Sequence, residues 1–197
     1  MKQVLIETQL FKPSKGLLSE GKMSERGNPL VHGILATCEV ENGNGRFYSE
    51  DLWKREIDKY MELVKENRAC GELDHPESQV VNLKNVSHNI KDINWDGKNI
   101  MGTIEILPTP SGNILKALID SGITVGVSSR GMGSLEQNGD IMEVQDDFEL
   151  LCWDFVSTPS NPGSFMALKE GKENNINVYA KANSIVTEIL CANGNCP

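Results

Sequence analysis

The chain lacks an excess of basic residues and any long hydrophobic run, and each absence excludes a class of function. Its 197 residues carry 28 acidic and 19 basic side chains, a formal charge of −9. Without a basic stripe to neutralise phosphates, we expect no nucleic-acid partner and no anionic-membrane partner. No run approaches the roughly 18 apolar residues of a membrane span, and the first residues turn acidic too soon for a signal peptide. We therefore expect a soluble protein that stays where it is made.

Cysteine and histidine are scarce, which narrows the chemistry. Five cysteines cannot all pair within one chain, and Cys38, Cys70 and Cys152 lie beside predicted strands or helices, as reduced core thiols do. Cys191 and Cys196 lie in an Asn- and Gly-rich tail, where their spacing is weak evidence for a metal. We expect no disulfide framework, no metal and no cofactor.

Length and composition predict one folded domain with loose ends. With 39% apolar residues, the chain is long enough for one buried core and short for two. We predict an N-terminal strand and flexible arm over residues 1–30, within which residues 9–30 read as an extended arm or loop. A folded domain over 31–170 and a flexible tail over 171–197 complete the chain.

Local patterns predict an α+β fold. The clearest element is an amphipathic helix that begins after Ser49, an N-cap residue followed by two acids. Asp-Gly at 96–97 predicts a tight hairpin turn. Because such turns join antiparallel neighbours, we predict an antiparallel barrel-like sheet flanked by a few helices. The other predicted elements are single strands over 34–40, 86–95, 99–107 and 124–135, two strands within 141–157, and a helix over 111–121 with Ile114, Leu115, Leu118 and Ile119 facing inward.

Two short segments carry the groups that acyl transfer needs most. Gly-Glu-Leu-Asp-His-Pro at 71–76 places His75 between an acid and a proline, and Gly-Val-Ser-Ser-Arg-Gly at 126–131 contains a serine pair. A base and a nucleophile of these types indicate a serine hydrolase. Taken alone, His75 would more often be a surface or capping histidine. The alternative for Ser128 is a glycine-weakened barrel strand with a bulge.

An acid in a third segment could orient the base. Asp154 is embedded in the apolar run 150–156, where a carboxylate is costly unless it has a partner. Glu143 and His88 are the next choices for this role. We therefore predict a site built from His75, Ser128 and Asp154.

These motifs resemble a known family. Gly-Glu-Leu-Asp-His-Pro, followed by Gly-Val-Ser-Ser-Arg-Gly-Met-Gly-Ser-Leu, is similar to the prohead core proteases of T-even-type tailed phages, as are the opening Leu-Ile-Glu-Thr and Arg-Phe-Tyr at 46–48. The resemblance covers roughly residues 3–170. It implies a serine endopeptidase related in fold to the herpesvirus maturation protease. It also implies action inside the assembling prohead, in the host cytoplasm, on scaffold proteins, capsid proteins and finally the protease itself.

The resemblance carries roles to individual residues. It implies that His75 is the general base and Ser128, the first of the two serines, the nucleophile, while Asp154 would hold the imidazole in the right tautomer. The backbone near Ser129, Arg130 and Gly131 would supply the oxyanion donors.

The family's preference for cleavage after Glu in an aliphatic-x-Glu context suggests a further role for Arg130. Its guanidinium could pair with the substrate carboxylate, and a salt bridge inside the barrel is the alternative. Aliphatic-x-Glu segments in the predicted arm and tail would be cleaved after Glu20, Glu170 and Glu188.

Two other classes of function stay open at this point. A metal hydrolase could use Glu72, Asp74 and His75, but adjacent side chains in an extended segment converge poorly on one ion. An inactive protein of the same fold could bind capsid or scaffold proteins. No pattern indicates the oligomeric state, so a homo-oligomer is open as well.

Overall fold

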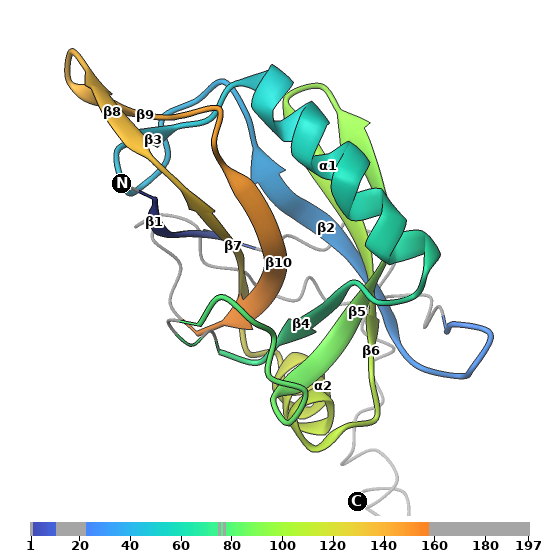
Figure 1. Cartoon of the computed structure of the whole chain (residues 1–197). Coiled ribbons are helices and arrows are strands. Elements are labelled where there is room, and N and C mark those ends of the chain that lie inside the picture. Colours follow the sequence, from blue (N-terminus) through green and yellow to red (C-terminus); the bar gives the residue numbers. More distant parts are fainter. Residues whose placement is uncertain (1, 11–22, 75, 77, 158–197) are drawn as a thin grey trace, which may run out of the picture.

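The computed structural model describes residues 2–10, 23–74, 76 and 78–157, and within them strands form three sheets (Figure 1). The first sheet has the order β1-β7-β10, the second β2-β6-β5-β4 and the third β3-β9-β8. The strands are β1 (Gln3–Leu10), β2 (Leu30–Thr37), β3 (Arg46–Phe47), β4 (Cys70–Glu72), β5 (Val86–Asp96), β6 (Asn99–Ile106), β7 (Gly126–Gly133), β8 (Leu135–Asn138), β9 (Ile141–Val144) and β10 (Glu149–Val156). The helices are α1 (Glu50–Lys65) and α2 (Pro110–Asp120).

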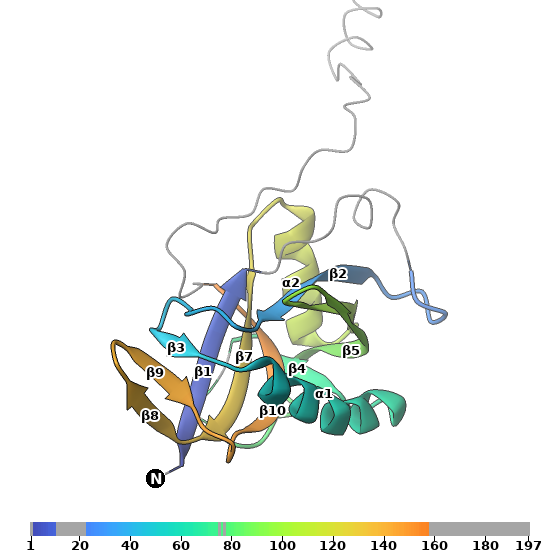
Figure 2. The same cartoon turned by 90° about the horizontal axis from the view of Figure 1, so that it is seen from above.

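The first two sheets meet where β10 passes β4. Leu73, just after β4, forms an isolated parallel bridge with Phe155 of β10. α1 crosses the second sheet in Figure 1, and α2 lies near the start of β5, where the Thr109 hydroxyl donates to the Val86 carbonyl. Figure 2 shows the β3-β9-β8 sheet beside β1, on the side away from α2. The α+β class and the predominantly antiparallel pairing are confirmed, with β3 and β9 as a parallel pair.

The core lies between α1 and the sheets. The buried face of α1 contributes Trp53 and Tyr60, and both rings contact Trp153 of β10, with centroids 6.1 and 4.9 Å apart. Phe148 packs edge-on against Trp53 at 5.8 Å. Each large side chain buried in this way contributes about 1.5–3 kcal/mol. These contacts fix the position of β10, and therefore of Asp154.

Several local predictions are confirmed. Ser49 caps α1, because its hydroxyl oxygen accepts a hydrogen bond from the backbone N–H of Leu52. The hairpin between β5 and β6 turns at Gly97, whose φ of 59° suits glycine. Cys38, Cys70 and Cys152 carry no disulfide. Within the described residues, neither helix is long and apolar enough to cross a membrane.

Other predictions need correction. The strand predicted over 34–40 is β2, which ends at Thr37 because Glu39 takes a φ of 57° and turns the chain out of the ladder. Ile114, predicted to face inward, is 54% exposed, because α2 buries only a narrow stripe that includes Leu115.

The arm predicted over residues 9–30 is also shorter than expected. β1 extends to Leu10, a bridge joins Met23 to Pro29, and β2 begins at Leu30. The predicted tail over 171–197 lies outside the described residues, and so do residues 11–22 of the arm.

Candidate active site

Ser128 lies in the middle of β7, the central strand of its sheet. In the antiparallel registers it is directly opposite Asp154 of β10 and Thr8 of β1. Residues directly opposite each other in a sheet present their side chains to the same face. Ser128 and Asp154 therefore lie side by side on one face, and both residues are fully buried.

The second serine faces the other way. Ser129 is opposite Trp153 in the register of β7 with β10, and Trp153 packs against Trp53 and Tyr60 of α1. Because side chains alternate along a strand, Ser129 points into this core while Ser128 shares the opposite face with Arg130.

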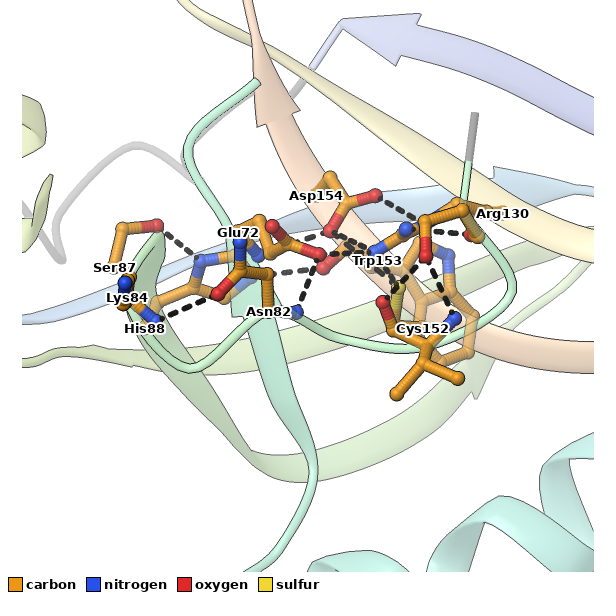
Figure 3. A network of polar contacts seen from close by, with 11 residues as sticks. Glu72, Asn82, Lys84, Ser87, His88, Arg130, Cys152, Trp153 and Asp154 are labelled. Atoms are coloured by element: carbon orange, nitrogen blue, oxygen red, sulfur yellow. Dashed lines mark hydrogen bonds and ion pairs between the residues drawn. The ribbon is translucent and has the colours of Figure 1, made fainter. Parts of the chain in front are cut away.

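The Asp154 carboxylate is held by two elements. Its Oδ1 accepts a hydrogen bond from the backbone N–H of Glu72 at 2.9 Å, and its Oδ2 lies 3.0 Å from Nε of Arg130 (Figure 3). Burial raises the pKa of Asp154, while the Glu72 amide and the Arg130 charge oppose that shift. Oδ2 accepts no hydrogen bond from the described residues, so its acceptor capacity remains for a further donor.

Arg130 is fully buried, and its guanidinium is engaged by protein groups. Nη2 donates to the Glu72 carboxylate at 2.8 Å, and Nη1 donates to the Ser78 carbonyl at 2.8 Å. Together with the Asp154 contact, this is a buried salt bridge of the kind predicted as the alternative to a substrate-binding role. A guanidinium that already serves two buried carboxylates has little capacity left for a third.

The predicted oxyanion donors belong to the central strand β7. Ser129, Arg130 and Gly131 lie on a strand that is paired on both sides, with β1 and with β10. Backbone N–H groups of such a strand point within the sheet toward neighbouring strands, not toward the face that carries Ser128. Gly131 serves packing instead, because a Cβ there would lie 2.4 Å from the Phe148 ring.

His75 lies outside the described residues, and the residue before it, Asp74, is bound to β10. The backbone N–H of Asp74 donates to the carbonyl of Phe155 at 2.8 Å. Asp74 has a φ of 58°, an unusual value outside glycine. The chain that carries His75 is thus attached to β10 next to Asp154.

The other two histidines have structural partners. His88 is fully buried, with Nε2 donating to the Trp153 carbonyl at 3.0 Å and Nδ1 accepting from the Ser87 hydroxyl at 2.8 Å. Burial lowers the pKa of His88 to about 4, against the opposing effect of its bond to Trp153. His32 is half-buried on β2 and bonds Thr103. Because both nitrogens of His88 are occupied, it is a poor alternative to Asp154.

The two described residues of the alternative metal site, Glu72 and Asp74, do not converge. Glu72 is fully buried and binds Arg130 and the backbone N–H of Asn82, whereas Asp74 is exposed. Across the part of the chain that the structure describes, no three His, Cys, Asp or Glu side chains are grouped to hold a metal ion.

Sequence reasoning missed Glu72 as a member of the site. Its carboxylate joins Arg130 to the segment that follows β4. The sequence patterns did not predict β4 as a strand. The position of Glu72 in the same motif as His75 could have suggested this role. The sequence pattern alone could not show that the Glu72 side chain points into the protein.

A buried serine and a buried carboxylate side by side on neighbouring strands of an α+β fold are the arrangement expected of a serine hydrolase. Comparisons with known proteins narrow the class. Residues 8–176 match the family described as prohead core protein serine protease. The chain is 33% identical to the prohead core protein protease of Enterobacteria phage T4 over 145 residues. This aligned region covers 71% of this chain and 68% of that protein. The structure of the bacteriophage T4 capsid assembly protease, gp21, superposes with a TM-score of 0.69 at 29% identity, over 80% of this chain and 99% of that one.

The chain therefore belongs to the prohead core protein serine proteases. It is a serine endopeptidase of the kind that matures phage capsids.

Proposed function

We propose that this protease cleaves scaffold and capsid proteins, and then itself, inside the phage prohead in the host cell. Cleavage follows Glu in an aliphatic-x-Glu context. The names of the T4 relatives, a prohead core protease and a capsid assembly protease, support this assignment of substrates and place. The proposed catalytic residues are His75, Ser128 and Asp154.

The observation that carries the assignment of residues is the register of β7 with β10. It puts Ser128 beside Asp154, and the hydrogen bond from Asp74 to Phe155 attaches the histidine-bearing segment to the same strand. The described groups Ser128 and Asp154 are neighbours in this register, and the Asp74 hydrogen bond supports the proposal that His75 acts with them. Acyl transfer by a serine requires this combination of side chains.

The mechanism follows from the roles of the three groups. His75 removes the proton from the Ser128 hydroxyl as its oxygen attacks the scissile carbonyl, and a tetrahedral intermediate forms. The intermediate collapses when the same imidazole gives the proton to the leaving amine, which leaves an acyl-enzyme. Water, activated by His75, then hydrolyses the ester and frees Ser128.

Asp154 has the supporting role in this scheme. Its Oδ2 accepts no hydrogen bond from the described residues, and it would take the N–H of the imidazole, thereby setting the tautomer and stabilising the imidazolium. The oxyanion donors come from outside the paired part of β7, since the amides there face the neighbouring strands.

The two serines provide a matched test of the nucleophile. Ser128→Ala should abolish hydrolysis of a fluorogenic aliphatic-x-Glu peptide and abolish labelling by a fluorophosphonate. Ser129→Ala removes the same atom from the next residue and should keep substantial activity, because that side chain faces the core. Circular dichroism would confirm that both variants fold. An active Ser128→Ala protein, or a dead Ser129→Ala protein that is folded, would refute the assignment.

A further inference from the structure

Arg130 occupies the junction of three strands and one loop. Its guanidinium leaves β7, reaches Glu72 at the end of β4, and lies against Asp154 and Cys152 of β10. It also donates to the backbone carbonyl of Ser78. Figure 3 shows Glu72, Cys152 and Asp154 gathered around the Arg130 side chain. The Arg130 and Glu72 side chains are 1% and 0% exposed, so the contacts are shielded from water.

Several described residues of the loop between β4 and β5 are held at this junction. Glu72 Oε1 accepts from Arg130 and also from the backbone N–H of Asn82 at 3.0 Å. Leu73 donates its N–H to the carbonyl of Asn85, which ties the start of the loop to its end. Ser78, between these points, is held by Arg130. His75 belongs to this loop by sequence.

We propose that Arg130, acting through Glu72, is a positioning residue that holds the His75-bearing loop and the Asp154 carboxylate in register with Ser128. The inference rests on the proposed function, because it takes His75 and Asp154 as members of the catalytic site. A guanidinium suits this task, since its planar fork donates in several fixed directions at once. A lysine ammonium at the same place could not reach all of these acceptors.

Arg130 also sets the electrostatics of Asp154. The titratable groups that face Asp154 are Glu72 from β4, Arg130 from β7, Cys152 on its own strand and Tyr60 from α1. Arg130 is the cation among these four. Its charge favours the ionised carboxylate, which the proposed mechanism needs, against burial and the repulsion of Glu72.

The test compares Arg130→Lys and Arg130→Met with the unaltered protein, using the full chain. The readout is the rate of fluorophosphonate labelling across the pH range, which reports the reactivity of the serine without a bound substrate. A displacement of about 1 Å in a catalytic group costs roughly 100-fold in rate, so Arg130→Met should label about 100-fold more slowly and Arg130→Lys about 10-fold more slowly. The acid limb of the labelling profile should move to higher pH in Arg130→Met and stay in place in Arg130→Lys.

Arg46 offers a matched control in the same chain. Its guanidinium also bridges a buried carboxylate and a backbone carbonyl, those of Glu7 and Ile6, at 2.7 and 3.3 Å. Glu7 is opposite Ser129 in the register of β1 with β7, so this pair lies on the other face of the sheet from Ser128. Arg46→Lys and Arg46→Met should therefore lower the melting temperature yet leave the labelling rate within about 3-fold and the acid limb unchanged.

The possible outcomes separate this inference from the proposed function. Labelling of Ser128→Ala at the rate of the unaltered protein would refute the nucleophile and leave nothing for Arg130 to position. If Ser128→Ala is unlabelled while folded Arg130→Met is labelled normally, the positioning role alone is wrong. Should Arg130→Met not fold, Arg130→Lys decides: slower labelling with an unchanged acid limb supports the role, and normal labelling refutes it.

Discussion

Ser128 and Asp154 are direct partners in the antiparallel register of β7 with β10, although two further strands, β8 and β9, lie between them along the chain. A hairpin-like return of the chain through β8 and β9 is what brings β10 back alongside β7. The pairing places a hydroxyl and a carboxylate on one face of the sheet. Both groups belong to strands, and neither belongs to a loop. The relative positions of the two groups are therefore set by sheet hydrogen bonds, and they should be rigid.

Asp154→Asn should lower kcat/KM on an aliphatic-x-Glu peptide by about 1000-fold, because an amide cannot select the imidazole tautomer as a carboxylate does. The same change removes a charge from a buried pair, so the free energy of unfolding should fall by about 3 kcal/mol. Peptide kinetics and urea unfolding measure the two effects. Asp147→Asn, which alters a carboxylate that binds Ser134, is the control and should keep its activity. Full activity in Asp154→Asn would show that another acid orients the imidazole, and Glu143 would be the next candidate.

His75→Ala should lower activity nearly as much as Ser128→Ala. The residues of a catalytic unit act together, so the effects of their substitutions on the rate are not additive. Fluorophosphonate labelling should vanish as well, because the serine would lose its base. His32→Ala is the control: His32 bonds Thr103 on β6, and its loss should leave the labelling rate unchanged. Normal labelling of His75→Ala would point to another base.

The buried His88 predicts a loss of stability in acid. Its pKa is about 4 in the folded protein against 6.5 for an ordinary histidine. Between these values the unfolded chain binds the proton and the folded protein does not, so stability is full above pH 6.5 and falls as the pH drops toward 4. The loss should reach about 3 kcal/mol at pH 4.

Urea unfolding from pH 7 to pH 4 would measure this loss. A His88→Gln variant should be less stable at neutral pH, yet show a shallower decline across the same interval. The difference between the stability curves of the unaltered protein and His88→Gln separates the effect of His88 from that of carboxylates that titrate in the same pH range. Parallel curves would show that His88 does not carry the acid sensitivity.

Gly71→Ala should disrupt the anchoring of β10 to β4. A Cβ at this position would lie 2.0 Å from the Trp153 carbonyl and 2.3 Å from His88 Nε2, the two atoms of one hydrogen bond. We expect a loss of about 3 kcal/mol in the free energy of unfolding, as for overpacked cores. At Gly27, a Cβ would meet nothing within 4 Å but the φ is +76°, so Gly27→Ala should cost only about 1 kcal/mol. Equal losses would refute the steric argument.

Self-cleavage should occur where the chain can enter an active site as an extended peptide. New ends are expected after Glu20, Glu170 or Glu188, which lie outside the described residues. Glu7 ends a similar aliphatic-x-Glu segment, but it lies in β1 with its carboxylate bound by Arg46 and Tyr48, so cleavage there should be slower. Intact-mass spectrometry of protein on prolonged incubation would identify the ends, and the Ser128→Ala protein should show none of them. Ends after basic or aromatic residues would sink the proposed specificity.

Local patterns were sufficient for the elements that depend on near neighbours. The cap at Ser49, the apolar stripe of α1 and the turn at Gly97 all involve residues a few positions apart, and each was predictable from intrinsic preferences. The catalytic residue types were visible in two motifs for the same reason. The strand β4, only three residues long, could not be predicted from its own residues. It forms because it pairs with β5 and contacts β10, and these contacts depend on residues far away in the sequence.

The amino-acid sequence by itself determined that a serine, a histidine and a partnered acid were present. Only the tertiary structure decided which serine faces the acid and what holds that acid. Arg130 and Glu72 are 58 positions apart, and no pattern in either segment says whether the arginine binds a substrate or a buried carboxylate. That choice depends on the register of β7, since a shift by one residue would turn Ser128 and Arg130 to the other face. Register is set by the packing of Trp153 and Phe148 against α1, which is a property of the whole fold.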